Sequence, residues 1–165
     1  MLTLPETIER PEQAYAYINY TVRMDQMQQP ADEGFPVLLQ HVADQGLIPV
    51  GAPFYNYRRI NMADTLDVEA GVPLERAGEA SDRVKFGTLP GGRFVTLDWI
   101  GHPDKLERVT GMLIGWLRLT EQPLDMEERG DGDHFACRLE IYEDGPDTEP
   151  DINKWKTTLQ FKLKD

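Results

Sequence analysis

Apolar and polar residues alternate in two runs near the C-terminus of the chain. In the first run, Leu139 and Ile141 face one way while Glu140 and Tyr142 face the other, as successive side chains of a strand do. The run is too short and too rich in β-forming residues for a helix. A second run, Thr157 to Lys164, alternates in the same way. We therefore predict two strands joined by an acidic, proline-containing loop, with a carboxylate beside a phenol on one surface.

The first half of the chain has the pattern of a strand, a helix and two further strands. Apolar residues recur at helical spacing after Gly34, and Gly46 is suited to end that helix. Pro73, near the end of the last strand, predicts either an edge position or the exit from the sheet. The predicted elements are a strand at Gln13 to Met24, a helix at Gly34 to Gln45, and strands at Phe54 to Ile60 and Leu66 to Leu74.

The second half repeats this order. Two short strands flank Pro90-Gly91-Gly92, which we interpret as a hairpin turn. The predicted elements are strands at Lys85 to Leu89 and Arg93 to Ile100, a helix at Asp104 to Leu119, and strands at Phe135 to Tyr142 and Thr157 to Lys164. Strand-helix-strand-strand thus occurs twice. We predict an α+β fold in one domain, residues 1–165, with a first module at about 13–78 and a second at about 83–164 that share a core.

The charge balance argues against one class of partner. The 165 residues have a formal net charge of −12, with no cluster of Lys and Arg. Nucleic-acid binding depends on such a cluster to neutralise phosphates, so direct nucleic-acid binding is not expected. The simplest interpretation of the acidic balance is solubility.

The sequence offers no pattern typical of a metal site, a disulfide or a membrane-spanning segment. Cys137 is the only cysteine, and its place in a predicted strand favours a structural thiol. His41, His102 and His134 have no metal-like spacing, and we expect His102 to cap or precede a helix. The N-terminus has no signal-peptide pattern, and no apolar run reaches the about 20 residues that span a bilayer. We expect a cytoplasmic protein without a cofactor or metal.

Six short motifs follow one another along the chain: Gly51-Ala52-Pro53-Phe54-Tyr55, Val68-Glu69-Ala70-Gly71-Val72-Pro73-Leu74, Leu89-Pro90-Gly91-Gly92-Arg93-Phe94, Gly101-His102-Pro103-Asp104-Lys105-Leu106, Leu139-Glu140-Ile141-Tyr142 and Thr157 to Leu163. Their order and spacing extend over most of the chain. Together they resemble one known family, the GyrI-like small-molecule-binding domain, also called the AraC-type or multidrug-regulator effector-binding domain.

The resemblance implies a groove between two pseudo-symmetric modules, with Glu140 facing it and aromatic side chains stacking on cationic ligands. Two positions of the closing strand depart from the family pattern: Thr158 stands where a Glu is usual and Lys162 where a Pro is usual. We expect the first departure to remove one acidic group near the groove. No DNA-binding segment precedes the motifs, so a stand-alone version of the domain is expected.

Glu140 is the leading candidate for ligand recognition, because a carboxylate flanked by aromatics attracts organic cations by charge and by cation–π contacts. The alternative is that it faces solvent on an ordinary amphipathic strand. The candidate aromatic wall residues are Tyr142, Tyr17, Tyr57, Trp99 and Tyr55. Trp116, on the apolar stripe of the second helix, is better explained as core packing.

Three functions are compatible with these residues. The first is a module that binds amphipathic, cationic small molecules, alone, as a homodimer or with a separate regulator protein. The second is a hydrolase, since some members of the family resemble enzymes that open strained electrophilic rings. Glu140 would be the general base and Tyr142 a second catalytic group, with Tyr17 and Tyr57 as alternatives for the polar group that opposes Glu140. The third is modulation of gyrase, because an acidic surface can mimic DNA toward a basic partner.

Overall fold

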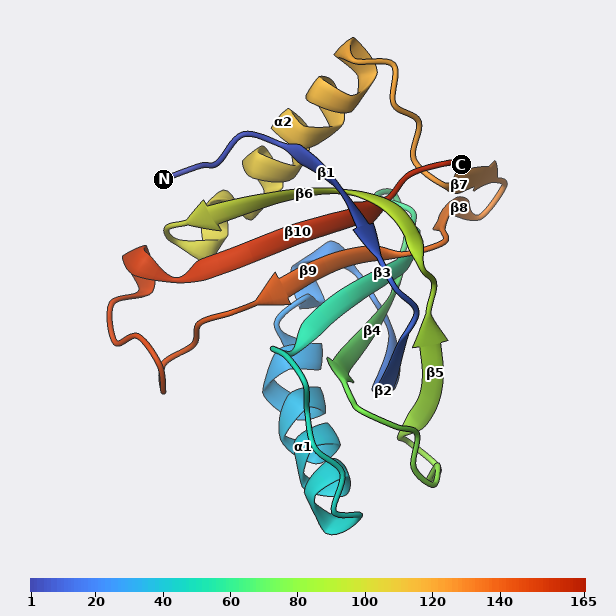
Figure 1. The fold of residues 1–165 in the computed structure, drawn as a ribbon, viewed down its shortest axis with the longest axis vertical. Coiled ribbons are helices and arrows are strands. Elements are labelled where there is room, and N and C mark those ends of the chain that lie inside the picture. The colour runs from blue at the N-terminus through green and yellow to red at the C-terminus, as the bar shows by residue number, and fades with distance from the viewer.

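A computed structural model describes residues 1–165 of the protein, and its main feature is one large antiparallel sheet with two α-helices (Figure 1). The helices are α1, Phe35–Asp44, and α2, Leu106–Leu119. The strands are β1 Glu6–Arg10, β2 Gln13–Val22, β3 Phe54–Ile60, β4 Leu66–Pro73, β5 Lys85–Leu89, β6 Gly92–Ile100, β7 Met126–Arg129, β8 Gly132–Phe135, β9 Arg138–Tyr142 and β10 Lys156–Lys162.

The sheet contains the same strand arrangement twice. Its order is β1-β6-β10-β9-β3-β4-β2-β5, with the β7–β8 hairpin beside the end of β3. In the first half β4 lies between β2 and β3, and in the second half β10 lies between β6 and β9. The two halves meet where β3 pairs with β9. The predicted α+β class and the repeated strand-helix-strand-strand order are confirmed.

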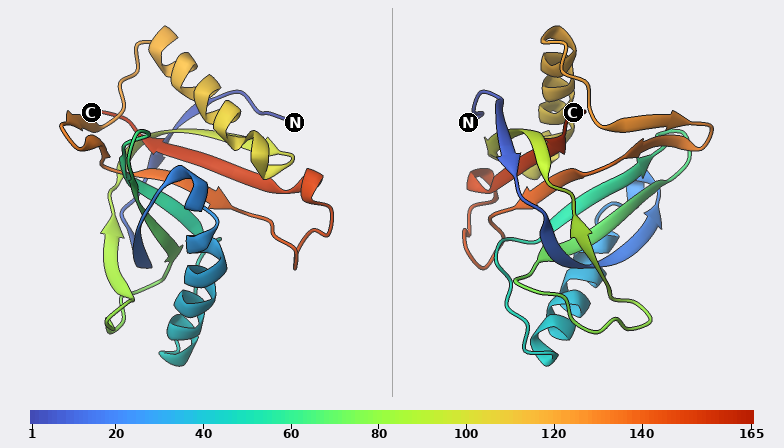
Figure 2. Two further views of the ribbon diagram at one scale, coloured as in Figure 1. Left: turned by 180° about the vertical axis from the view of Figure 1, so that it is seen from behind. Right: turned by 45° about the vertical axis from the view of Figure 1, so that its right-hand side comes forward.

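Both helices cover the same face of this sheet, at opposite ends of the molecule (Figure 2, left). Helix α1 presents Leu38 and Val42 to a core cluster that includes Ile18 of β2. Helix α2 presents residues three and four positions apart, among them Val109 and Leu113, to a cluster that includes Leu159 of β10. This spacing places an apolar stripe on one side of each helix, which explains why both helices pack on the sheet.

The opposite face carries a third core cluster, formed as the sheet curls. It contains Tyr15, Phe54, Phe94, Cys137 and Leu139. Because β1 is followed directly by β2, and β5 directly by β6, these two pairs of strands bend together around the cluster. Burial raises the pKa of the Cys137 thiol to about 12, as expected for the structural role predicted for this cysteine.

The predicted hairpin at Pro90-Gly91-Gly92 is wrong. Strand β5 pairs with β2, whereas β6 pairs with β1 and β10. Because β5 and β6 do not pair with each other, the chain bends at these glycines and does not fold back on itself. A side chain at Gly91 would lie 3.0 Å from the Arg10 carbonyl oxygen and the Glu12 amide nitrogen, and Gly92 has a φ of +130°. The glycines therefore serve a close crossing of two bent strands.

Other strand predictions need smaller corrections. The predicted strand Phe135 to Tyr142 is interrupted, with β8 ending at Phe135 and β9 beginning at Arg138. Strand β1 and the β7–β8 hairpin were not predicted, because their residues are mostly polar and exposed. Pro73 marks the exit of β4, which is an interior strand, so the edge alternative is wrong.

Neither α-helix is both long enough and apolar enough to cross a membrane.

Candidate functional site

Glu140 lies in the middle of a row of directly opposed residues that crosses the sheet. From the second half to the first, the row reads Leu97, Leu159, Glu140, Tyr55, Ala70 and Ile18. Leu97 and Leu159 belong to the cluster beneath α2, and Ile18 belongs to the cluster beneath α1. The carboxylate is the one charged group in this row, and it lies between the two parts of the sheet that the helices cover.

The alternation predicted for β9 is confirmed. Leu139 is fully buried in the cluster on the opposite face, together with Ile141 at its margin. Glu140 and Tyr142 are half-buried on the face that carries the helices. We call the group Tyr55, Tyr57, Arg138, Glu140 and Tyr142 the central surface, because all five come from the two strands that meet between the helices.

Glu140 has a neutral hydrogen-bond partner and no ion pair. The Tyr142 hydroxyl donates to Glu140 Oε1 at 2.6 Å. Burial raises the pKa of the Glu140 carboxyl, and the hydrogen bond from Tyr142, the charge of Arg138 and the nearby Tyr57 oppose this only in part. Burial also raises the pKa of Tyr142 well above its usual range, so its hydroxyl remains a donor. The site is thus a partly desolvated carboxylate held by one phenol, that of Tyr142.

Aromatic rings surround this carboxylate on the α1 side. The Tyr55 ring meets the Tyr142 ring edge to face at 5.2 Å and stacks on Phe35 of α1 at 5.7 Å. Tyr57 meets Tyr55 edge to face at 6.2 Å. Tyr55 is buried and donates its hydroxyl to the Met27 carbonyl oxygen at 2.7 Å, so it supports the surface from below. Phe35 was not predicted here, because its helical spacing indicated only core packing.

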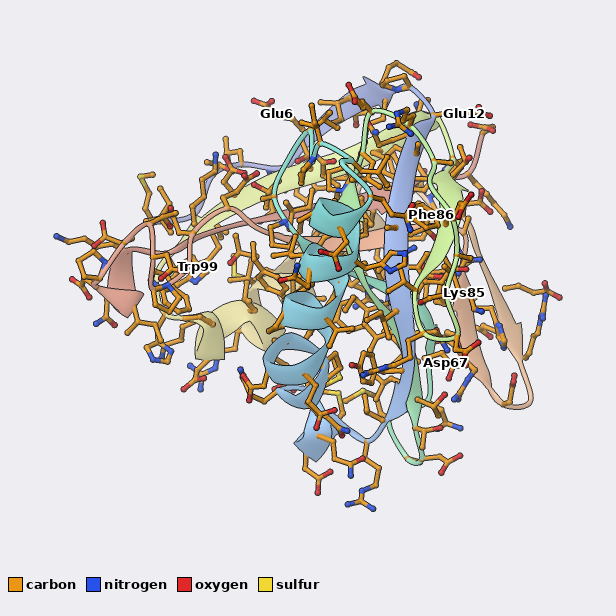
Figure 3. The ribbon with its side chains drawn as sticks, turned by 90° about the horizontal axis from the view of Figure 1, so that it is seen from below. Glu6, Glu12, Asp67, Lys85, Phe86 and Trp99 are labelled. Carbon is orange, nitrogen blue, oxygen red and sulfur yellow. The ribbon has the colours of Figure 1, made fainter.

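The structure brings together four of the six residues predicted to bind ligand: Glu140, Tyr142, Tyr55 and Tyr57. Trp99 lies on the same face, but in the part covered by α2, where its indole N–H donates to the His102 carbonyl oxygen at 3.2 Å. In Figure 3, Trp99 lies on one side of α1, and Phe86 and Lys85 of β5 lie on the other. His102 itself caps the helical turn before α2, as predicted.

Tyr17 lies on the opposite face of the sheet. It is paired with Gly71, whose other neighbour is Phe54, and its ring stacks on Tyr15 at 5.0 Å. The alternation of β2 has Ile18 and Tyr20 on the helix side, which turns Tyr17 away. Tyr17 is therefore separated from Glu140 by the thickness of the sheet.

Thr158 also lies on the face away from Glu140, which corrects one sequence-based expectation. It is paired with Ile141 and Asp98, and its hydroxyl donates to Asp98 Oδ1 at 2.7 Å. A Glu at this position would not point to the central surface, so Thr158 removes no charge from it. Lys162, the other departure from the family pattern, faces the same way and pairs with Asp125 at 3.2 Å.

Arg138 is the residue of the central surface that sequence reasoning missed. Its guanidinium carbon lies 4.7 Å from the centre of the Phe135 ring, 4.8 Å from Phe161 and 5.8 Å from Tyr57. Burial lowers the pKa of this guanidinium, although it remains charged at neutral pH. The one available signal was its position two residues before Glu140, which places both side chains on the same side of the strand.

A second buried carboxylate, Glu69 of β4, was also missed. It accepts hydrogen bonds from the Tyr15 hydroxyl at 2.7 Å and from Asn56 Nδ2 at 2.9 Å. Burial raises the pKa of Glu69. These groups lie on the opposite face, among the residues of the third core cluster, and they satisfy one another, which indicates a structural network.

Two hollows lie away from the central surface. The larger, about 580 Å³, is an open cleft with charged groups of both signs around the β7–β8 hairpin, including Arg58, Arg129 and His134. The smaller, about 200 Å³, lies on the opposite face near Phe54 and Ile141. Glu140 lines neither of them. No group of three or more His, Cys, Asp or Glu side chains is placed to hold a metal ion.

The chain matches the sequence profile of one family and the folds of several solved structures. The GyrI-like small molecule binding domain matches residues 4–164. The chain is similar to the C-terminal domain of EcmrR, at 20% identity and a TM-score of 0.77, with 98% of each chain covered. It spans only 57% of the EcmrR chain in a complex with DNA, at a TM-score of 0.79 and 20% identity over 98% of this chain.

Two further solved structures, one of a protein bound to a ligand and one of a hydrolase, have a similar fold. SAV2435, solved bound to tetraphenylphosphonium, is 15% identical over 98% of this chain and 94% of its own, at a TM-score of 0.59. A hydrolase from Listeria innocua is 14% identical over 97% of this chain and 91% of its own, at a TM-score of 0.63. No curated protein matches the sequence. At these identities the structures establish a shared fold, and the match over nearly the whole chain establishes the family: this protein belongs to the GyrI-like small-molecule-binding domain family.

Proposed function

We propose that the protein binds amphipathic organic molecules with a positively charged group on its central surface, and that Glu140 recognises the charge. The observation that carries this proposal is a half-buried carboxylate with a phenol as its hydrogen-bond partner and no cation paired to it. A buried carboxylate without an ion pair is costly, and a ligand cation that replaces water beside it recovers part of that cost.

The rings around Glu140 support the same function. Tyr57 and Tyr142 are half-buried, so apolar parts of a ligand can cover the parts of their rings that remain exposed. Cation–π contacts with such rings contribute about 0.5–2 kcal/mol each. Because SAV2435, which has the same fold, was solved bound to tetraphenylphosphonium, this lipophilic cation is a suitable first probe.

Calorimetric titration with tetraphenylphosphonium tests the proposal. We expect saturable binding by the wild-type protein and a loss of about tenfold or more in affinity for Glu140→Gln, which keeps the shape and removes the charge. Glu128→Gln, an exposed carboxylate of β7, is the matched control and should bind as the wild type does. Equal affinity in the wild type and Glu140→Gln would remove Glu140 from the site.

A second function is favoured by the 2.6 Å hydrogen bond between Tyr142 and Glu140. A carboxylate with a raised pKa is suited to general base catalysis near neutral pH, and a similar structure is named a hydrolase. In a hydrolysis of a strained ring, Glu140 would take a proton from water, and the water oxygen would form a bond to a cyclopropane carbon. The ring bond breaks, and its electron pair moves into the conjugated carbonyl, which takes up the proton.

The two functions differ in what happens to the ligand. Incubation with a cyclopropane-bearing conjugated ketone, followed by mass spectrometry, would show a product heavier by one water if the protein is a hydrolase. That product should be lost in Glu140→Gln and retained in Glu128→Gln. Recovery of the unchanged compound from a protein that binds it would leave binding alone as the function.

A further inference from the structure

Arg138 lies beside Glu140 on the central surface, and its surroundings differ from those of an ordinary buried arginine. Both side chains leave β9 on the helix-covered face, two residues apart, and Arg138 is directly opposite Phe161 of β10. Phe135, Phe161 and Tyr57 surround the guanidinium at 4.7, 4.8 and 5.8 Å. The three rings hold the cation in place by cation–π contacts.

The rings leave the hydrogen-bonding capacity of this guanidinium unused. A guanidinium has five N–H donors directed outward in its plane, and ring faces are poor acceptors for them. The Arg138 side chain donates no hydrogen bond within the protein and forms no ion pair; only its backbone amide is engaged, with Asn56 Oδ1 at 3.1 Å. Arg59, on the neighbouring strand, provides the contrast, since its guanidinium donates to Asp67, Thr65 and Asp131.

The formal charges of Arg138 and an ionised Glu140 cancel, so the central surface has one group of each sign and no excess of either. A purely cationic ligand satisfies Glu140 and leaves Arg138 with its donors unpaired. Two residues of a strand are separated by about 7 Å along its axis. A ligand with a carboxylate at about this distance from its cationic group would match both side chains, because guanidinium and carboxylate pair through two parallel hydrogen bonds.

We propose that Arg138 forms a second subsite for a carboxylate, and that the preferred ligands are zwitterionic aromatic molecules whose cation contacts Glu140. This inference rests on the proposed binding function and specifies its ligand class. Arg138 is then a residue that determines specificity, whereas Glu140 determines whether a cation is bound at all.

Two dyes that differ by one methyl ester test the inference. Rhodamine 110 has a xanthylium cation and a free carboxylate, and rhodamine 123 is its methyl ester, with the cation alone. In anisotropy titrations at neutral pH, we expect the wild-type protein to bind rhodamine 110 about tenfold more tightly, the usual effect of a charge-assisted hydrogen bond. Equal affinities, or tighter binding of the ester, would overturn the inference.

Variants of Arg138 assign the preference to this side chain. Arg138→Gln should remove the preference for the acid and leave the ester bound at least as tightly, while Arg138→Lys should keep part of it, since an ammonium retains charge without the planar fork. Arg76→Gln, an exposed arginine after β4, is the matched control. An unchanged preference in a folded Arg138→Gln or Arg138→Lys would also contradict the inference.

The same titrations separate this inference from the proposed function. If tetraphenylphosphonium binds and the acid is not preferred, the carboxylate subsite is wrong and the binding function stands. If neither the phosphonium ion nor either dye binds, the proposed function fails and the subsite fails with it.

Discussion

The Tyr142 hydroxyl donates a hydrogen bond of 2.6 Å to Glu140 from two residues away on the same strand. The pair forms without any long-range rearrangement, because residues i and i+2 of a strand face the same side. The environment of the pair, however, comes from β3 and α1, which supply Tyr55 and Phe35. A locally defined pair thus becomes a desolvated site only in the folded chain.

Binding of a permanent cation should weaken as the pH falls, with a midpoint above the ordinary Glu pKa of about 4.3. Burial raises the pKa of Glu140, so its carboxylate takes up a proton, and loses its attraction for the cation, at a higher pH than an exposed Glu. Tyr57 and Tyr142 remain neutral because burial raises their pKa, and Arg138 remains charged. Calorimetry with tetraphenylphosphonium over a pH series measures the midpoint.

The pH dependence should disappear in Glu140→Gln, which cannot titrate. A wild-type midpoint at or below the ordinary Glu pKa would contradict the expected raised pKa, even if the cation binds.

Tyr142→Phe should weaken binding of the phosphonium ion at neutral pH by roughly two- to tenfold, the range of a single hydrogen bond. The variant keeps the ring and removes the donor that helps to hold Glu140 ionised, so the pH midpoint of binding should also move upward. The effect should be absent when Tyr142→Phe is made in the Glu140→Gln background. An equal loss in both backgrounds would mean that the hydroxyl acts on the ligand directly.

Tyr15→Phe should destabilise the fold by about 1–3 kcal/mol, because it leaves the buried Glu69 carboxylate with one donor fewer. Urea unfolding at neutral pH measures the loss. Binding of the phosphonium ion should be unchanged, since this network lies on the face opposite Glu140. Tyr17→Phe is the control, because no hydrogen bond of its hydroxyl is lost, and it should change the unfolding free energy by less than about 0.5 kcal/mol.

Gly92→Ala should cost about 1–3 kcal/mol of unfolding free energy, since its φ of +130° is a conformation that residues with a side chain rarely adopt. Gly130→Ala in the β7–β8 turn is the control, because a side chain there meets no atom within 4 Å. Denaturant unfolding of both variants measures the difference. Equal stability of the two variants would show that an alanine adopts the backbone conformation of Gly92 without measurable cost.

The sequence was sufficient to predict most helices and strands, and the Glu140–Tyr142 pair of the central surface. The helices and the strands with clear alternation were predicted close to their true bounds, and Glu140 and Tyr142 were correctly assigned to one face of β9. The polar strands β1, β7 and β8 were missed, because their residues do not form a buried face and so leave no periodic signal.

Tyr17 and Arg138 show why the full set of residues on the central surface could not be predicted. Tyr17 lies in a strand that alternates, but which of its two faces meets the helices depends on how β2 pairs with β4. Arg138 is a charged residue that would ordinarily face solvent, and it lies among rings only because β8 and β10 supply Phe135 and Phe161.

The sequence by itself determined the local geometry: the period-two alternation of the strands, the helical stripes, and a carboxylate beside a phenol on one surface of β9. The tertiary structure decided which strands are neighbours. It converted the turn signal at Pro90-Gly91-Gly92 into a bend, turned Thr158 away from Glu140, and placed Tyr55 opposite Glu140 from 85 positions away, since Tyr55 pairs with Glu140 across β3 and β9. The physical reason is that alternation depends on adjacent residues, whereas strand pairing depends on burying both faces of the whole sheet at once.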